Sequence, residues 1–391
     1  MTTHNVPYRD LVCSLNEPGW NYGHERSPFY RHDLEEGATF VVYNRRMMPV
    51  SMKTSTREEG YWAMRRAVTR LDTGELPTEI SGPDAAALLD RIFTRAVSNL
   101  KPGRCTYGIA CWPDGGILVD GILIRLAEDR FWYVQADGDI FAWMRAHGMG
   151  MDVQITDPQS WVHQLQGPKA LDLLADACDD GMPVEFRYFD AREVAMGGQK
   201  VMITRTGWTG EVGFEVYTNP SLDTDALWNH ITAAGTAHGL LDIGLDPMDT
   251  RRIEAAILNN GSDMDSTMTP YAAGLGMFVD LDGPDFFGKE ALRRADRRTR
   301  MYGIACDAAE PLIGGPVSRD GRRIGHVTAS SWSPYLKKGI GYVRLESADD
   351  VDPRSAQVMG FDLAAHECRL VDLPFYDADK KIPRGLETVT V

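Results

Sequence analysis

The 391-residue chain lacks the motifs by which many nucleotide-dependent and metal-dependent enzymes are identified. No Gly-x-Gly-x-x-Gly follows a strand pattern, and phosphate-binding loops, Gly-x-Ser-x-Gly elbows and His-Glu-x-x-His motifs are missing. The nine histidines are scattered without metal-ligand spacing, so we expect no metal site. The six cysteines include no Cys-x-x-Cys and are typical of reduced thiols in a cytoplasmic protein.

Long apolar runs and an excess of basic residues are also missing. No stretch approaches the ~18–20 apolar residues of a membrane helix, and the first residues show no secretory signal. The net charge of −15 and the pI near 5.1 disfavour binding to nucleic acid or to an anionic membrane. An anionic small molecule is still permitted, because a local field can oppose the global one.

What the chain does contain is a glycine-rich stretch, residues 205–217, between two strand patterns. A simple hairpin is one interpretation, since glycine tolerates positive φ. Two carboxylates beside an indole, Glu211 and Glu215 near Trp208, are harder to explain as a turn. Glu215 lies within a strand pattern, and a carboxylate there needs hydrogen-bond donors. A heterocycle with ring N–H groups would supply them.

An internal repeat links two distant segments. Residues 80–89 and 165–174 both follow the pattern apolar-x-Gly-Pro-x-Ala-x-x-Leu-Leu. Each copy predicts a strand that ends at glycine and a helix with proline at its first position. Either the similarity is chance, or the chain contains two related α+β halves.

A strand pattern between the two copies carries one isolated charge. Along residues 117–126, Asp120 shares its face with apolar side chains such as Leu118 and Ile122. A buried aspartate is either satisfied by structural donors or placed for chemistry, and the pattern leaves both open.

Further periodicities predict the remaining elements. Helices are expected over residues 56–70 and over 249–258, the second capped by Asp249. Beyond residue 300, short β patterns predict a small antiparallel β domain, over residues 301–306, 323–327, 339–345 and 364–371.

Taken in order, these motifs resemble the aminomethyltransferase (glycine-cleavage T-protein) superfamily. The matching pieces include Gly-Gly-Ile-x-x-Asp, Leu-Gln-Gly-Pro-x-Ala, Arg-Thr-Gly-Trp-Thr-Gly-Glu-x-Gly-Phe-Glu, Arg-x-Glu-Ala and Asn-Gly-x-Asp-Met-Asp, and the likeness runs from about residue 38 to residue 371. The resemblance implies an α+β, three-domain cloverleaf with two related α+β halves, a C-terminal antiparallel β-barrel-like domain and tetrahydrofolate in a central channel. The implied divisions are an N-terminal segment 1–60 packing on the folate domain, a folate- and substrate-binding region 61–292 and a C-terminal β domain 301–391.

Other pieces are similar to the dimethylsulfoniopropionate demethylase branch, such as Ser-Pro-Phe at residues 27–29 and Gly-Arg-Cys-x-Tyr at 103–107. Members of that branch move a methyl group from a small onium or methoxy substrate to tetrahydrofolate. T-proteins carry two acids after the glycine pair, whereas this chain has Val119 followed by Asp120. T-proteins also have an arginine that helps bind the folate tail, where this chain has Met248. The segment 209–211, in contrast, is T-protein-like.

The resemblance and the residue chemistry together assign roles. We expect Asp120 to be catalytic and Glu215 to accept hydrogen bonds from the pterin N–H groups. The aromatic candidates are expected to line the substrate site, and the arginines to hold a carboxylate of the substrate or of folate. The cofactor-binding set is Glu215, Tyr107, Arg252 and Glu211, and the substrate-binding set is Trp208, Tyr22, Phe29 and Arg46. Core packing is the alternative for each aromatic.

The predicted function is that of a tetrahydrofolate-dependent methyltransferase acting as a demethylase on a small methylated onium compound or methoxy acid. A sulfonium such as dimethylsulfoniopropionate, or a quaternary or tertiary amine, is the kind of substrate expected. The alternatives are a glycine-cleavage-type aminomethyltransferase and a folate-binding protein without turnover. We expect no nucleic-acid or membrane partner, and a homodimer is one alternative for the oligomeric state.

Overall fold

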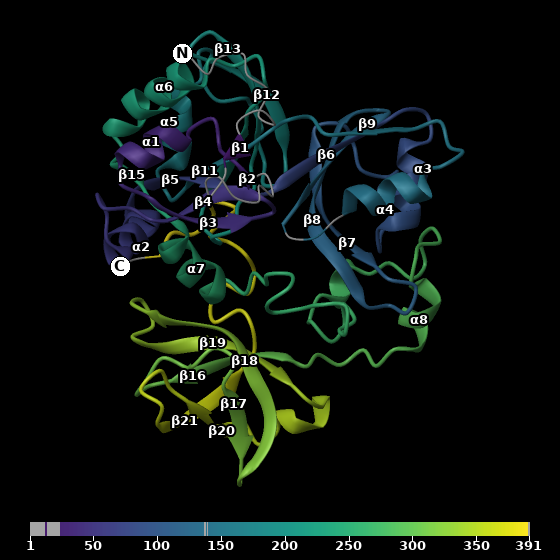
Figure 1. Ribbon diagram of the computed structural model, residues 1–391, viewed down its shortest axis with the longest axis vertical. Coiled ribbons are helices and arrows are strands. Elements are labelled where there is room, and N and C mark those ends of the chain that lie inside the picture. Colours follow the sequence, from purple (N-terminus) through teal and green to yellow (C-terminus); the bar gives the residue numbers. More distant parts are fainter. Residues whose placement is uncertain (1–11, 14–23, 137, 139, 390–391) are drawn as a thin grey trace.

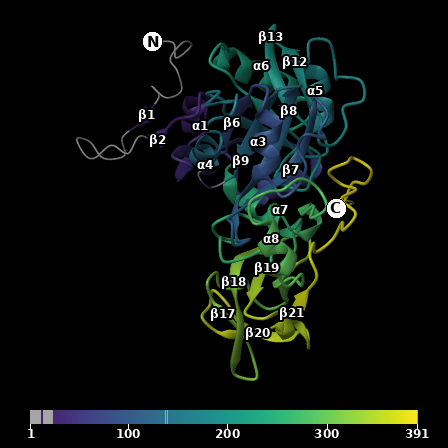
Figure 2. The same ribbon diagram turned by 90° about the vertical axis from the view of Figure 1, so that its right-hand side faces the viewer.

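The computed structural model describes residues 12–13, 24–136, 138 and 140–389, and it has three lobes (Figure 1). Two α+β lobes lie side by side, and a β-barrel lies below them. The turned view in Figure 2 shows the C-terminal segment running back upward from the barrel along one side. The predicted α+β fold class with a C-terminal barrel is confirmed.

The first lobe is built on a five-stranded antiparallel sheet in the order β10-β6-β9-β8-β7. Its strands are β6 (Leu76–Ser81), β7 (Arg104–Cys111), β8 (Ile117–Ala127), β9 (Arg130–Gln135) and β10 (Gln154–Thr156). Two helices, α3 (Ala85–Ile92) and α4 (Ile140–His147), bury their apolar sides against one face of this sheet. The other face meets the second lobe, where Ile124 and Trp132 pack with Tyr217.

The second lobe has a six-stranded sheet in the order β12-β13-β14-β11-β5-β15, antiparallel except for the β5–β15 pair. Its strands are β5 (Val68–Thr73), β11 (Val162–Gln166), β12 (Ala191–Met196), β13 (Gln199–Thr204), β14 (Gly213–Tyr217) and β15 (Leu240–Asp242). The helices α5 (Ala170–Ala177) and α6 (Thr224–Thr236) cover it and contribute to its buried cluster.

A small N-terminal sheet with the order β1-β2-β4-β3 adjoins this lobe, together with three helices. These elements are β1 (Val12–Cys13), β2 (His24–Glu25), β3 (Thr39–Tyr43), β4 (Arg46–Ser51), α1 (Tyr30–Glu35), α2 (Arg57–Arg66) and α7 (Leu245–Glu254). Helix α2 begins with a capping box between Thr56 and Glu59.

Two of the predicted helices have different bounds. The helix expected over residues 56–70 ends at Arg66, because Ala67 leaves the helical region (φ −137°, ψ −128°) and a β-branched residue then starts β5. The helix expected from Asp249 is α7, which begins at Leu245 after Gly244. Asp249 lies inside that helix and pairs with the buried Arg252 instead of capping the helix.

The internal repeat has a shared geometry. Strand β6 leads through Gly82 into α3, and β11 leads through Gly167 into α5, with φ of +122° and +138° at the two glycines. A Cβ at Gly82 would lie 2.6 Å from a backbone oxygen, and one at Gly167 would lie 2.4 Å from another. The prolines that follow stand in the turn and precede the first helical residue by two positions, so the expected proline at the first helical position is wrong.

The barrel is closed by six antiparallel strands in the order β16-β19-β18-β17-β20-β21. They are β16 (Met301–Cys306), β17 (Pro316–Arg319), β18 (Arg322–Ser333), β19 (Lys338–Leu345), β20 (Ser355–Met359) and β21 (Ala365–Val371). Strands β17 and β20 were not predicted. Three short helices complete the chain: η2 (Gly276–Phe278), α8 (Lys289–Arg294) and η3 (Ala348–Val351).

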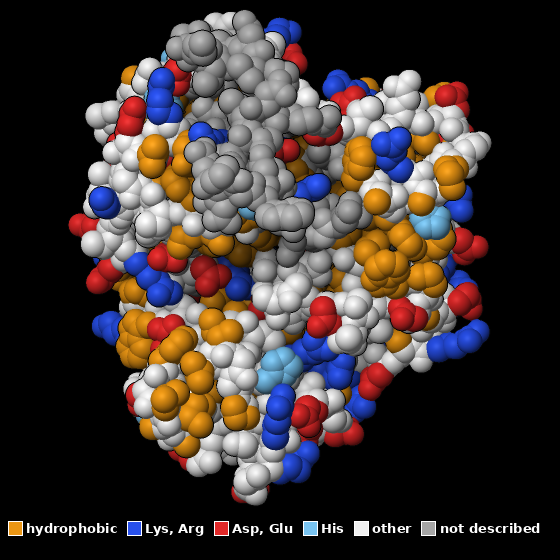
Figure 3. Space-filling model, viewed as in Figure 1, with side chains coloured by type: hydrophobic (Ala, Val, Ile, Leu, Met, Phe, Trp, Pro, Cys, Tyr) orange, Lys and Arg blue, Asp and Glu red, His pale blue; other side chains and the backbone are white. Residues whose placement is uncertain are grey.

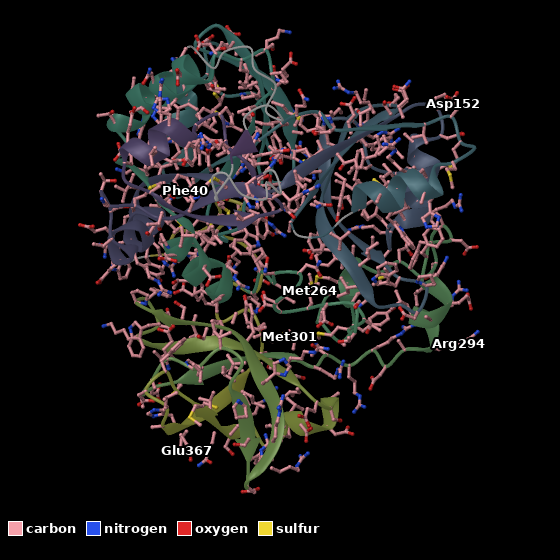
Figure 4. All side chains as sticks on the ribbon, viewed as in Figure 1. Phe40, Asp152, Met264, Arg294, Met301 and Glu367 are labelled. Carbon is pink, nitrogen blue, oxygen red and sulfur yellow. The ribbon has the colours of Figure 1, made fainter. Side chains whose placement is uncertain are left out.

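An apolar cluster and a network of buried charged side chains connect the lobes. Met264 and Met301, labelled in Figure 4, belong to one apolar cluster where the α+β part meets the barrel. A charged network of Arg65, Arg251 and Glu254 lies between α2, α7 and the C-terminal segment, and the Tyr376 hydroxyl contacts all three. On the face in Figure 3, basic and acidic side chains are interspersed. Across the described residues, no helix combines the length and hydropathy that spanning a bilayer requires.

Candidate functional site

A cavity of about 1610 Å³ lies where the three lobes meet. Its wall combines strands β7 and β8 of the first lobe, the loops 185–190 and 205–208 of the second, the segment 256–278, the start of β16 and the C-terminal segment. This volume exceeds the roughly 300–1,000 Å³ of ordinary small-ligand pockets. The cavity therefore has room for an extended ligand together with a second reactant.

Asp120 projects from β8 into this cavity and is 5% exposed. The Tyr107 hydroxyl on β7 donates a hydrogen bond to Oδ2 of Asp120 across 2.6 Å. Burial, and then the negative charge of Asp120, raises the pKa of Tyr107 well above its ordinary value. The phenol therefore keeps its proton and acts as a donor that orients the carboxylate.

Glu215 lies in the same cavity wall, on β14 of the second lobe. Its Oε2 accepts hydrogen bonds from the hydroxyls of Tyr217 at 2.8 Å, Thr206 at 2.8 Å and Thr204 at 3.4 Å. Burial raises the pKa of Glu215, and these three hydroxyls oppose that shift. Three donors saturate one carboxylate oxygen, so Oε1 is the atom left to meet a ligand.

A second acid, Glu75, stands beside Glu215. The Gln164 side-chain amide lies 3.4 Å from Oε1 of Glu75 and 3.3 Å from Oε1 of Glu215. Burial, and then the charge of Glu215, raises the pKa of Glu75 to about 7. The cavity thus contains two adjacent carboxyl groups, and burial raises the pKa of both.

Basic side chains outnumber acidic ones in the wall of the cavity, although the whole chain carries a net charge of −15. Eight lysines and arginines line it against six acids. Arg104 and Arg192 are paired with Asp190, whereas the exposed Lys101 and Arg384 have no ion pair among the described residues. Such a wall attracts an anionic ligand into an otherwise acidic protein.

The structure thus brings together four of the predicted site residues: Asp120, Tyr107, Glu215 and Trp208 all line the cavity. Trp208 is half-buried against an apolar cluster, and the Arg252 guanidinium lies 5.2 Å from its ring centroid. One face of the indole is therefore covered by a cation of the protein itself.

The other predicted residues lie elsewhere. Arg252 is buried and pairs with Asp249 and Asp263, and Glu211 is buried and pairs with Arg251 and Arg65. Neither side chain lines the cavity. Their ion pairs connect different segments of the chain, and their proposed roles in binding a ligand stay predictions.

The N-terminal candidates are also set apart. Phe29 is fully buried and packs against His163 and Trp228. Arg46 is buried over the Trp161 ring and donates to the backbone oxygen of Glu75. Neither residue lines the cavity. Tyr22 lies outside the described residues.

Sequence reasoning missed Glu75, Gln164 and Tyr217. Tyr217 could have been predicted, because it follows Glu215 by two positions in one strand and therefore lies on the same face of the strand. Gln164 is brought opposite Glu215 by the pairing of β11 with β14, which no local pattern shows. Glu75 had only the weak signal of an acid in a two-residue connection between two strand patterns.

The two positions that differ from T-proteins are apolar and buried. Val119 joins the cluster between the first sheet and its helices, on the strand face opposite Asp120. Met248 packs with Met64 and Leu71 under α2. Neither lines the cavity, so neither alters its wall directly.

Comparisons with known proteins find relatives of one family along most of the chain. The family model described as the GCVT N-terminal domain matches residues 29–283, and that of the glycine cleavage T-protein C-terminal barrel domain matches residues 300–377. An aminomethyltransferase of Clostridium botulinum is 38% identical over 279 residues, which cover 68% of this chain and 75% of that protein. The aminomethyltransferase of Bacillus subtilis is 32% identical over 373 residues, covering 90% of this chain and 99% of that protein.

A solved structure supports the same relationship. The glycine cleavage system aminomethyltransferase T from Bartonella henselae superposes with a TM-score of 0.82 at 25% identity, covering 90% of this chain and 98% of that one. Fold, barrel and sequence likeness coincide, and the chain therefore belongs to the aminomethyltransferase (glycine cleavage T-protein) family.

Proposed function

We propose that this chain is a tetrahydrofolate-dependent aminomethyltransferase that takes its one-carbon unit from an aminomethyl group on a lipoyl carrier. Aminomethyltransferases of this family use tetrahydrofolate. The proposal rests on one observation: Asp120 and Glu215, from separate lobes and separate motifs, line the same cavity. Relatives matched over nine-tenths of the chain carry the name aminomethyltransferase.

The residues around Glu215 fit a pterin ring. Its Oε1 lies in a buried environment, where the one side-chain donor found within the described part of the chain is the Gln164 amide, at a long 3.3 Å. Neighbouring N–H groups of a flat heterocycle would satisfy this oxygen by charge-assisted hydrogen bonds. Tetrahydrofolate, when bound, supplies the nitrogens that take up the one-carbon unit.

Asp120 is the group that we expect to hold or move a proton in the reaction. Tyr107 fixes Oδ2 of Asp120, so the carboxylate keeps one orientation. Positioned proton transfer contributes about 10²–10⁴-fold to a rate. Apolar wall residues, including Ile122, Val134 and Leu258, limit the water that reaches this carboxylate.

The basic side chains of the wall suit the anionic end of a folate. Lys101 and Arg384 are exposed and lie in the cavity lining. We propose that they attract the glutamate carboxylates, and that this role compensates for the apolar Met248.

The test uses the purified chain, tetrahydrofolate and an aminomethyl-loaded lipoyl protein. Release of ammonia together with 5,10-methylenetetrahydrofolate is the expected result, and omitting the lipoyl protein should abolish it. Failure to produce either product with a lipoyl protein that a known aminomethyltransferase accepts would contradict the proposal.

A second candidate is demethylation of a small onium or methoxy acid, and the aromatic lining of the cavity favours it. Tyr107, Trp208, Tyr188, Phe189 and Phe278 all line the wall. Aromatic faces attract onium cations by about 0.5–2 kcal/mol each. This reading predicts 5-methyltetrahydrofolate from a panel of onium and methoxy acids without any carrier protein. Folate binding without turnover on either donor class would leave a non-catalytic folate-binding protein.

A further inference from the structure

Glu75 occupies the junction between the two α+β lobes. Strand β5 of the second lobe ends at Thr73, and strand β6 of the first begins at Leu76, so Gly74 and Glu75 form the whole connection between these two strands of different sheets. The link runs along the cavity, and Glu75 is part of its wall. A carboxyl group therefore lies where ligand contacts from both lobes converge.

The hydrogen bonding of Glu75 is incomplete. Its Oε1 receives a long contact of 3.4 Å from the Gln164 amide, which is shared with Glu215, and the Thr73 hydroxyl and the backbone N–H of Glu75 also favour its ionised form. Its Oε2 is buried and has no hydrogen-bond partner among the described residues. Buried polar atoms of native proteins are nearly always satisfied, so an unsatisfied one in a cavity wall indicates a ligand or water contact.

The charged groups facing Glu75 determine which of the two acids takes a proton. They are Glu215 on β14 and Arg46 on β4, and Arg46 is itself paired with Glu25 on β2. Burial and Glu215 raise the pKa of Glu75 to about 7, against the opposing effects of the Thr73 hydroxyl and Arg46. Glu215 has three hydroxyl donors that favour its ionised form, and Glu75 has no comparable set.

We propose that Glu75 is a specificity residue that reads the 4-position of the pterin: Glu215 accepts from the 2-amino and N3–H groups, while the Glu75 carboxyl donates to the neighbouring 4-oxo oxygen. This inference rests on the proposed function, in which the pterin lies against Glu215. An acceptor carboxylate beside a donor carboxyl matches the two neighbouring donors and the adjacent acceptor along the edge of a 2-amino-4-oxo ring. A 4-amino ring presents a donor where this site also presents one.

The test compares folic acid with aminopterin in calorimetric titrations of the full chain at pH 6.5 and pH 8.0. Folic acid has a 4-oxo group and an N3–H, whereas aminopterin has a 4-amino group and an unprotonated N3. At pH 6.5 we expect folic acid to bind about tenfold more tightly, because the 4-amino group leaves buried donors facing each other. Between the two pH values the preference should fall roughly tenfold, since ionised Glu75 accepts instead of donating.

Three variants separate this role from a structural one. Glu75→Gln should bind folic acid with no change in preference between the two pH values, because a rotating amide presents either a donor or an acceptor. Glu75→Leu should lose the part of the preference that depends on Glu75 and keep the part that the N3–H contact with Glu215 provides. Glu193→Gln, an exposed glutamate on β12, should behave as the wild type. Because the two ligands also titrate, each change in preference between the two pH values is compared with that of Glu75→Leu, which has no ionisable group at position 75.

A wild-type preference that is equal at both pH values, or a Glu75→Gln protein that reproduces the wild-type change, overturns the role of Glu75. Glu215→Gln keeps that failure distinct from failure of the proposed function. If Glu215→Gln binds folic acid as tightly as the wild type, the folate site itself is misplaced. If Glu215→Gln weakens the binding of folic acid but the wild type shows no change in preference between the two pH values, the folate site stands and the Glu75 inference alone is overturned.

Discussion

The Tyr107 hydroxyl donates a 2.6 Å hydrogen bond to Oδ2 of Asp120, between the adjacent strands β7 and β8 at the cavity wall. Asp120 is buried and Tyr107 is half-buried, and the raised pKa of Tyr107 keeps its proton on the phenol. The hydrogen bond holds Oδ2 in place, and the orientation of the whole carboxylate, including Oδ1, is therefore set.

Asp120→Asn is expected to reduce turnover by about 10²–10⁴-fold, because an amide of the same shape cannot take up a proton. Tyr107→Phe removes only the orienting donor and should cost roughly tenfold. Steady-state rates measured beside calorimetric folate affinity will separate the effects, since the affinity should change little in both variants. A Tyr107→Phe protein as slow as Asp120→Asn would contradict a purely orienting role for the phenol.

Glu75→Gln is expected to stabilise the ligand-free protein at neutral and alkaline pH. An acid with a raised pKa in the folded state contributes stability that is fully present below its unfolded pKa, near 4.5, and is lost as pH rises through about 7. Glutamine cannot ionise, so the variant should gain up to about 3 kcal/mol at pH 8 and nothing at pH 4.5. Thermal melting across this range is the measurement, and a gain independent of pH would count against the raised pKa.

Arg251→Leu is expected to destabilise the fold without removing the site. Arg251 is fully buried and pairs with Glu211 at 2.8 Å and with Glu254, so its loss leaves two buried carboxylates with Arg65 alone. Breaking a buried pair in this way costs about 3–5 kcal/mol. Arg298→Leu, which removes an exposed pair, should cost less than about 1 kcal/mol.

Denaturant unfolding of both arginine variants will provide these values, with folate affinity measured on the folded fraction. A large loss of folate affinity in folded Arg251→Leu would show that the network acts on the ligand directly.

Gly167→Ala is expected to destabilise by about 1–3 kcal/mol, because φ is +138° there and the added methyl group meets the Ala67 backbone oxygen at 2.4 Å. Gly198→Ala is the comparison, since its φ is also positive but nothing lies within 4 Å. The difference between their unfolding free energies isolates the steric part. Equal losses in the two variants would show that the close approach relaxes freely.

Much of the architecture followed from local patterns. The Gly-Pro repeat identified two related strand–helix units because each one needs a residue at positive φ where the backbone turns tightly. The period of two along β8 placed Asp120 and Val119 on opposite faces, and the structure puts one in the cavity and the other in the apolar core. The division into segments 1–60, 61–292 and 301–391 stays a prediction.

The sequence by itself determined the α+β class, a C-terminal antiparallel β domain and the presence of Glu211 and Glu215 in one glycine-rich stretch, because short-range periodicity and turn chemistry are local properties. Only the tertiary structure decided that these two glutamates have different surroundings. Glu211 forms an ion pair with Arg251 of α7, whereas Glu215 lines the cavity beside Gln164 and Glu75. The physical reason is that a buried carboxylate takes its partners from whatever segments pack against it. Those segments lie tens to hundreds of residues away, so pairing across sheets and lobes assigns their roles.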